Sequence, residues 1–525
     1  MAYATHQHVN RRTQPIGKAI AIAAAVSLVS GFGAGMGVTA LLKASPGSQQ
    51  SIAATLNGPG GANTMNYDYT GTYSGALAAD GKEVTSDGET TTATQTDQNV
   101  VLAQNGGTLT ITNGKLVKSG DSSNSDNCNF YGTNSVLLAV GKQSKAVISG
   151  SSINAESAGS NGIFATDSAT VLANDVDIAT SAANSRGLDA TYGGSIIANG
   201  MTISTKGDHS ASLATDRGGG TVSVTGSTLS TAGSGSPLLY STGDIEVSGV
   251  TGTASGSQIA GMEGLNTILI NKSTLESTNT GTTGSDPVAN GVIIYQSTSG
   301  DADTSTGEHA TFQAKDSTLK SAIESGSMFY FTNATADVVL QNTRLDFDSS
   351  AADLIFAAGN DSNNWGSAGS NGATVNFTGR SQDLSGKVSA DTISTVTLNL
   401  LEGSSWTGSA EITENSAAIS GSSSASKAPI SVNVDGTSTW VVTADTTISA
   451  LNVASGGKVV DSSGRTVTIK AGGKTVVSGD SDLTVTVTGS YGTSVSAGSD
   501  TKLSSDVTDR AAFDKQFGAD TAWSF

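Results

Sequence analysis

Three sets of apolar positions recur along the middle of the chain, and each set advances by 25, 25 and 26 residues. The first set is Ala146, Val171, Ile196 and Val222, the second is Ile153, Ile178, Ile203 and Leu229, and the third is Ile163, Leu188, Leu213 and Leu239. Apolar and polar residues alternate around each position, and Gly, Asn, Asp and Ser separate the sets. This alternation is typical of a strand with one buried face. Each repeat therefore predicts three short strands joined by turns.

A repeat of this length cannot bury its own apolar face, but stacked copies can pair strand on strand around a continuous apolar column. The pattern therefore predicts an all-β fold, a single-stranded parallel β-helix with three strands per coil. A leucine-rich repeat is disfavoured because its Leu-x-x-Leu-x-Leu spacing is absent. A β-propeller would need a period of about 40 residues or more.

The pattern changes along the chain and suggests the limits of six segments. They are an export signal or N-terminal membrane anchor (1–43), a linker and N-terminal cap (44–99), regular coils (100–358), a loop (359–371), less regular coils (372–500) and a C-terminal cap with a short helix (501–525). Residues 299–309, "SGDADTSTGEH", predict an extruded acidic loop. Phe513 and Phe517 at helical spacing, followed by Gly518, predict the terminal helix.

The N-terminus indicates the compartment. Arg11, Arg12 and Lys18 precede an uncharged stretch over 19–42, which Lys43 closes. This stretch is long enough to cross a bilayer, which takes about 20 residues, and cleavage after its Ala40 would instead make it an export signal. In both cases the basic flank predicts that the chain from about residue 44 lies outside the cytoplasm. We therefore expect a secreted or cell-surface protein, with membrane anchoring through 19–42 as one of the two alternatives.

Composition narrows the classes of partner that the protein is expected to bind. Only 36% of the 525 residues are hydrophobic, and the net charge is -19 without a basic stripe. Nucleic acid is therefore not an expected partner. The single cysteine, Cys128, cannot form an intramolecular disulfide and is predicted to be buried. With only His209 and His309 after the export segment, no Cys/His metal site and no cofactor are expected.

Aromatic residues gather near the third predicted strand. If the outward-pointing ones align, they form a ledge whose rings and hydroxyls suit glycan rings or an extended protein partner. The candidate ligand-binding residues on this face are Phe164, Asp189, Tyr192, Tyr240, Tyr295 and Tyr330. The alternative is that some of these aromatic residues point inward and pack in the core. Asn174 and Asn199 are 25 residues apart, and their spacing predicts an amide ladder at a turn.

Several segments resemble a known group of proteins. "RGLDATYGGSIIANGMTIST", "LATDRGGGTVSVTGSTLST" and "SPLLYSTGDIEVSG" resemble secreted right-handed parallel β-helix proteins of bacterial surfaces, an adhesin-like group within the pectin-lyase-like superfamily. "GSSWTG" and "STWVVTADTTISALNVASGGKV" are similar to passenger domains of autotransporter adhesins, although no translocator barrel pattern follows residue 490. The resemblance implies a non-catalytic rod that binds a glycan or an extracellular or host surface protein through a lateral face.

The same superfamily includes polysaccharide lyases and glycoside hydrolases, so an enzyme of this class is the alternative function. Its candidate residues are Asp167, Asp175, Asp177, Asp189, His209, Asp216 and Arg217. In the stacked arrangement Asp189 points outward and has no second acid in its column. Asp216 and Arg217 lie in the turn "TDRGGG" and are predicted to be solvated. A catalytic set is therefore not expected.

Overall fold

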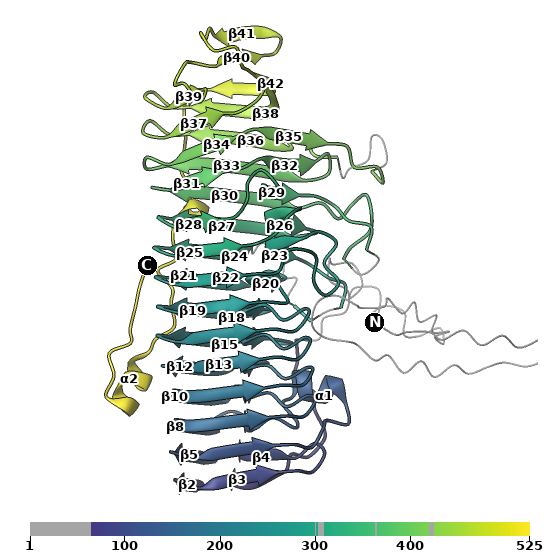
Figure 1. The fold of residues 1–525 in the computed structure, drawn as a ribbon, viewed down its shortest axis with the longest axis vertical. Coiled ribbons are helices and arrows are strands. Elements are labelled where there is room, and N and C mark those ends of the chain that lie inside the picture. Colours follow the sequence, from purple (N-terminus) through teal and green to yellow (C-terminus); the bar gives the residue numbers. More distant parts are fainter. Residues whose placement is uncertain (1–64, 300, 303–308, 363–364, 419–424) are drawn as a thin grey trace, which may run out of the picture.

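A computed structural model describes residues 65–299, 301–302, 309–362, 365–418 and 425–525. The expected export or anchor segment over 19–42 lies outside these residues. The described chain is a parallel β-helix, in which short strands wind into coils stacked along one long axis (Figure 1). No helix in this part of the chain is long and apolar enough to cross a membrane.

The first sheet contains the strands of the first predicted set, and nearly all of them pair in parallel with the next coil. Its strands are β2 (Glu83–Asp87), β5 (Thr108–Thr112), β8 (Lys145–Ala155), β10 (Thr170–Thr180), β12 (Gly194–Asn199), β15 (Gly220–Thr225), β18 (Asp244–Ser248), β21 (Thr267–Asn271), β24 (Ala310–Lys315), β27 (Thr335–Gln341), β30 (Thr374–Arg380), β33 (Thr395–Leu401), β36 (Ile430–Val434), β38 (Thr446–Val453), β40 (Thr468–Ala471), β41 (Lys474–Val477) and β42 (Thr484–Gly492).

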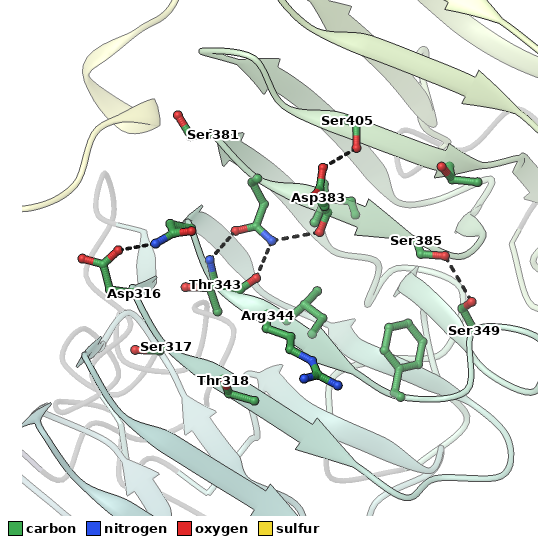
Figure 2. Close-up of a pocket in the computed structure, with 16 residues that line it drawn as sticks. Asp316, Ser317, Thr318, Thr343, Arg344, Ser349, Ser381, Asp383, Ser385 and Ser405 are labelled. Atoms are coloured by element: carbon green, nitrogen blue, oxygen red, sulfur yellow. Dashed lines mark hydrogen bonds between the residues drawn. The ribbon is translucent and has the colours of Figure 1, made fainter. Parts of the chain in front are cut away.

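The second sheet also includes the C-terminal halves of β8 and β10, and it is interrupted once. Below the break lie β3 (Thr90–Ala93), β6 (Lys115–Lys118), β13 (Thr202–Thr205), β16 (Thr228–Thr231), β19 (Thr251–Ala254), β22 (Thr274–Ser277), β25 (Thr318–Ser321) and β28 (Arg344–Asp346). Above it lie β31 (Asp383–Ser385), β34 (Ser405–Gly408), β37 (Thr439–Val442) and β39 (Lys458–Val460), which form a separate four-stranded sheet. A groove separates β28 from β31 (Figure 2).

The third sheet is continuous over thirteen strands. They are β1 (Gly75–Asp80), β4 (Asn99–Gln104), β7 (Leu137–Val140), β9 (Ile163–Thr166), β11 (Leu188–Ala190), β14 (Leu213–Thr215), β17 (Leu239–Ser241), β20 (Ala260–Glu263), β23 (Asn290–Tyr295), β26 (Ser327–Thr332), β29 (Asp353–Ala357), β32 (Val388–Asp391) and β35 (Ala410–Thr413). The helix α1 (Ser125–Phe130) lies in the connection between β6 and β7.

The registers confirm the three predicted columns. Paired positions follow one another as Val171, Ile196 and Val222 in the first sheet, as Ile178, Ile203 and Leu229 in the second, and as Leu188, Leu213 and Leu239 in the third. All of these side chains belong to one buried cluster that runs through the rod. The predicted amide ladder is also present, because Asn199 Nδ2 donates to Asn174 Oδ1 over 3.0 Å.

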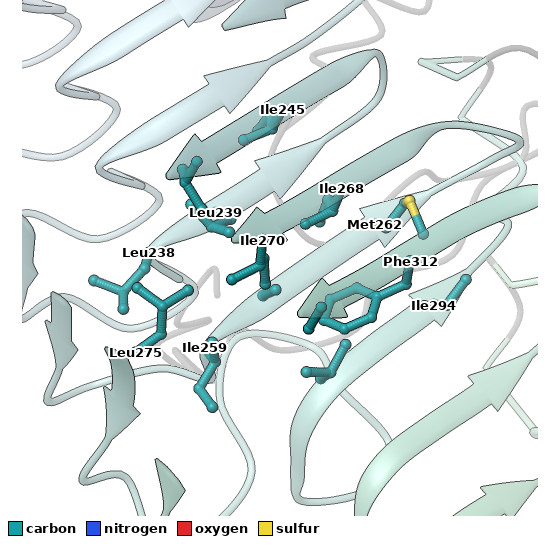
Figure 3. Packing of buried hydrophobic residues seen from close by; sticks show 14 of the residues in the cluster. Leu238, Leu239, Ile245, Ile259, Met262, Ile268, Ile270, Leu275, Ile294 and Phe312 are labelled. Atoms are coloured by element: carbon teal, nitrogen blue, oxygen red, sulfur yellow. The ribbon is translucent and has the colours of Figure 1, made fainter. Parts of the chain in front are cut away.

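One coil shows how the core tolerates an irregular position. The second column reaches Gly252 between Leu229 and Leu275. Leu238 lies beside this glycine, since a Cβ added at Gly252 would be 2.8 Å from Leu238 Cδ1. Figure 3 shows Leu238 and Leu275 packed together with Ile259 in this part of the core. A side chain from outside the column thus fills the space, and packing density is maintained.

The ends of the rod differ from the expected caps. The sequence placed the first coil at residue 100, but β1, β2 and β3 already form a coil that begins at Gly75 and pairs with the next one. At the other end, the hairpin of β40 and β41 supplies the antiparallel pair of the top coils. Among the described strands, β41 pairs only with β40, so this end of the first sheet finishes in an antiparallel hairpin and not in a further parallel coil.

The predicted terminal helix is present but does not cap the end. It is α2 (Ala511–Phe517), and Gly518 ends it with a left-handed backbone at φ 64°. After the short helix η1 (Ser499–Thr501), the chain runs back along the outside of the first sheet (Figure 1). Arg510 donates to Ala198 O over 2.8 Å, and Phe513 packs with Leu172 and Ile197. We call residues 499–525 the C-terminal strap.

Candidate functional site

All six residues of the predicted ligand-binding face are buried, so the expected open ledge is absent. Their exposed fractions range from 0% for Phe164, Asp189 and Tyr295 to 6% for Tyr192. The register itself agrees with the prediction, because Asp189 lies between Phe164 and Ala214 in one column of the third sheet. Tyr240 and Tyr330 continue that column through Gly261 and Ile293. The side chains do leave the core, but other segments cover them.

Two regions provide this cover. In the lower coils, Tyr67 and Tyr73 of the N-terminal segment pack against the buried cluster that contains Phe164. In the upper coils, Trp365 of the 359–371 loop is fully buried, and its ring stacks on Tyr295 with centroids 4.4 Å apart. The third sheet therefore has a second apolar layer outside the solenoid core. Strand alternation predicts which side chains leave the core, whereas inserted loops decide whether water reaches them.

Charged groups are buried between these covered aromatic residues. Arg186 Nε lies 3.5 Å from Asp189 Oδ2, and Arg186 Nη2 lies 3.4 Å from Asp216 Oδ2. Burial raises the pKa of Asp189 to about 7, although the Arg186 charge opposes the shift. Asp216 is 1% exposed, and burial raises its pKa as well. The prediction of a solvated Asp216 was wrong. Asp189 has no second acid in its own column, as predicted, but Arg186 pairs it with Asp216 from a neighbouring turn.

Arg217 is also buried, contrary to the prediction. Its guanidinium lies 3.6 Å from the ring centroid of Phe130 in the connection that contains α1. Arg217 Nε lies 2.5 Å from Asp301 Oδ1. Asp301 belongs to the segment expected to be an extruded loop, and it is instead folded against the third sheet with 5% exposure. The ion pair thus joins a turn of one coil to an insertion 84 residues later.

Another buried acid, Glu263, is surrounded by hydroxyl donors. Tyr295 donates to Glu263 Oε2 over 3.1 Å and Tyr240 over 3.2 Å, while Ser297 donates to Glu263 Oε1. Burial raises the pKa of Glu263 to about 7, Asp301 raises it further, and these hydrogen bonds lower it. Two predicted ligand-binding tyrosines therefore use their hydroxyls inside the protein.

The remaining candidates lie apart from this buried group. Asp175 and Asp177 are exposed on the flank of β10, and Asp167 is half-buried at a turn. His209 is half-buried, and burial lowers its pKa. Cys128 is buried as predicted, and burial raises the pKa of its thiol to about 11. Among the described residues, no three His, Cys, Asp or Glu side chains are placed to hold a metal ion.

An open groove of about 600 Å³ lies beside the covered face, at the turns that follow β4, β7 and β9. We call it the tyrosine groove. Its lining combines two half-buried aromatic rings, several exposed amides, a cation and an acid: Tyr67, Gly71, Thr72, Tyr73, Gln104, Asn105, Gly106, Val140, Gly141, Lys142, Gln143 and Asp167. Its volume falls within the range of about 300–1,000 Å³ that is usual for small-molecule sites.

A cluster of five tyrosines supports one wall of this groove: Tyr67, Tyr69, Tyr73, Tyr131 and Tyr192. Tyr131 and Tyr192 stack with centroids 5.5 Å apart and planes 4° from parallel. Tyr69 stacks on Tyr131 at 5.0 Å, and Tyr67 meets Tyr192 edge to face. Tyr192 adopts φ 47°, a left-handed backbone that is rare for a bulky residue. Packing of the tyrosine rings compensates the backbone strain at Tyr192, and the same packing fixes the orientation of the aromatic wall.

A larger groove, of about 910 Å³, lies at the break in the second sheet. Figure 2 shows its lining of hydroxyls, carboxylates and one guanidinium, which comes from Arg344. We call it the sheet-break groove. Neither Asp189 nor Asp216 lines the tyrosine groove or the sheet-break groove. The two open surfaces are therefore separate from the buried charges.

No protein-family model and no curated protein matches the chain. The functional conclusions therefore rest on the geometry of the sites themselves.

Sequence patterns missed the tyrosine groove, although its components were visible. Tyr67, Tyr69 and Tyr73 lie in "MNYDYTGTY", within the predicted linker and N-terminal cap over 44–99. Three aromatic residues within seven positions of a chain with 5% aromatic residues are a signal of local packing. Their partner Tyr131 is 58 or more residues away from each of them, and no repeat pattern links it to the cap.

Proposed function

We propose that this protein is a non-catalytic, extracellular or cell-surface rod of the adhesin type that binds a glycan through a lateral face. The observation that carries the proposal is the tyrosine groove, which presents aromatic rings beside exposed amides and one half-buried carboxylate. Ring faces bind the apolar faces of sugars, while fixed amides and acids bind their hydroxyls. This groove replaces the buried ledge as the proposed binding site.

The alternative, a polysaccharide-acting enzyme, receives less support from the geometry. A glycosidase needs two carboxyl groups that flank the scissile bond within about 10 Å. The buried acids Asp189 and Asp216 are 0% and 1% exposed and share the charge of Arg186. Substrate could meet them only if the covering segments moved. Buried ion pairs of this kind hold the covering segments on the third sheet. We therefore favour ligand binding over catalysis.

The test is a glycan array probed with the full-length protein in mild detergent. We expect a saturable ligand whose binding falls at least tenfold in Tyr67→Ala and less than threefold in Tyr67→Phe, because phenylalanine retains the ring. Tyr491→Ala is the matched control, since Tyr491 is also half-buried but lies outside the groove. Binding that is unchanged in Tyr67→Ala would exclude this groove. Sugar release that is lost in Asp216→Ala would favour the enzyme.

A further inference from the structure

The second sheet is broken at a level where the other two sheets are continuous. β27 pairs with β30 and β29 pairs with β32, so the coils there are in contact on two sides. Among the described strands, however, β28 pairs only with β25, and β31 pairs only with β34. Two strand edges therefore face each other across the sheet-break groove (Figure 2).

A side-chain amide occupies one end of this groove. The Thr343 N–H donates to Gln382 Oε1 over 2.8 Å, and Gln382 Nε2 donates to the carbonyl oxygens of Thr343 and, over 2.9 Å, of Asp383. The side chain of Gln382, which directly precedes β31, reaches to the backbone of Thr343, which directly precedes β28. The amide thus takes the place of a peptide group between the two edges. The N–H and the C=O group of this amide are therefore both hydrogen-bonded within the groove.

The rest of the groove offers backbone groups without a strand opposite them. The Arg344 N–H donates to the carbonyl oxygen of Ser317, which directly precedes β25, over 2.8 Å. Successive residues of a strand direct their backbone groups to opposite sides, so those of Leu345 face the groove. At the far end the hydroxyls of Ser349 and Ser385 lie 3.2 Å apart. The span between Gln382 and this pair suits a short extended segment.

The charge of the groove favours a basic ligand. Asp316 and Asp383 are exposed on its lining. The guanidinium of Arg344 is already paired, since its Nη2 lies 3.0 Å from Asp346 Oδ2. The carboxylates of Asp316 and Asp383 therefore have no cation opposite them within the lining, and a Lys or Arg side chain at the mouth would meet a favourable potential.

We propose that the sheet-break groove binds an extended peptide segment that carries Lys or Arg and adds as a strand between β28 and β31. Unpaired strand edges bind extended peptides through main-chain hydrogen bonds, and the side chains at the edge select among them. A glycan would find hydroxyl partners here, but it lacks the alternating N–H and C=O groups that the two edges can satisfy. This peptide site is independent of the proposed glycan groove.

The chain provides a matched pair of probes. Residues 317–321 read STLKS and residues 273–277 read STLES, so the two peptides differ only by Lys320 in place of Glu276. Both sequences form strands of the second sheet within the fold. We expect the fluorescent, end-blocked STLKS peptide to bind the full-length protein at least tenfold more tightly than STLES, measured by anisotropy at low salt. N-methylation of the leucine amide should abolish binding, because a strand needs that donor.

Variants of the protein locate the site. Ser385→Trp fills the groove and should abolish STLKS binding. Thr253→Trp is the matched control, because Thr253 is exposed on β19, which is paired on both edges. Asp383→Asn should reduce the ratio of the affinities for STLKS and STLES about threefold. Absence of STLKS binding at millimolar concentration, equal binding of the N-methylated peptide, or full binding by a folded Ser385→Trp variant would each overturn the proposal.

Discussion

Two outer faces of the same solenoid have opposite surroundings. The face of the third sheet is covered by the N-terminal segment, the connection with α1 and the long upper loops, and it buries aromatic and charged side chains. The face of the second sheet is open, and its Thr, Ser, Lys and Glu side chains lie in water or line the sheet-break groove. Both sheets contribute inward columns to one core, but the outward positions of the third sheet include Phe164, Ile293 and Tyr330, whereas those of the second sheet are mostly Thr, Ser, Lys or Glu. The difference shows that the outward side chains and the insertions that cover them together determine where charges are buried and where ligands can bind.

The largest expected effect is the loss of a cation from the covered face. Arg186→Met leaves the carboxylates of Asp189 and Asp216 buried without their counter-ion, and we expect a loss of about 3–5 kcal/mol in local stability. Hydrogen exchange of the amides in β11 and β14 would measure it. Arg344→Met on the open face is the control and should leave exchange unchanged. Equal effects of the two substitutions would contradict the comparison.

The next effect depends on pH. Because the pKa of Glu263 is raised to about 7 from its ordinary value of 4.5, the folded protein binds the proton more tightly than the unfolded chain. The stability that protonated Glu263 contributes to the folded protein is therefore lost as the pH rises from about 4.5 to 7.

Glu263→Gln removes this titration while it keeps the side-chain shape. The variant should be more stable than the parent at pH 8, by about 3 kcal/mol, and the difference should disappear at pH 4. Thermal unfolding at both pH values would measure it. A parent protein that gains stability between pH 5 and 8 relative to Glu263→Gln would contradict the burial of this acid.

The C-terminal strap gives an intermediate effect on the first sheet. Arg510 is 1% exposed and donates to Ala198 O and to the Ser223 hydroxyl, so Arg510→Ala should weaken strap docking by about 1–3 kcal/mol. Limited proteolysis should then cleave the strap several-fold faster. Lys515→Ala, at an exposed position of α2, is the control and should be cleaved at the parental rate. Unchanged cleavage of Arg510→Ala would show that the strap does not depend on this residue.

The smallest effect concerns an ion pair on the open face. Lys320 Nζ lies 2.8 Å from Glu276 Oε1 between neighbouring coils, in contact with solvent. Water and salt screen such pairs. The urea concentration at the midpoint of unfolding should therefore be the same for Lys320→Ala as for the parent, within experimental error. A clear loss of stability would mean that the open face also depends on its charges.

The sequence predicted a large part of the fold but little of the site. The columns through Ile203 and Leu213 followed from spacing alone, because each coil repeats the same inward positions. The tyrosine groove and the sheet-break groove did not, since each depends on segments that follow no repeat. Tyr131 and Gln382 acquire their roles from neighbours in other coils or insertions. The C-terminal strap was predicted as a cap with a short helix; the helix is present, but the strands on which Phe513 packs could not be read from its own residues.

The sequence by itself determined the β-helix, the direction in which each strand side chain points and the alignment of Ile178, Ile203 and Leu229, because period-two alternation repeated at a fixed interval has one compact solution. Only the tertiary structure decided which outward side chains are buried. Contacts such as Arg217 with Asp301 and Trp365 with Tyr295 join segments that are far apart in the chain. Their free energy depends on the closure of loops whose polar, glycine-rich sequences carry no periodic signal.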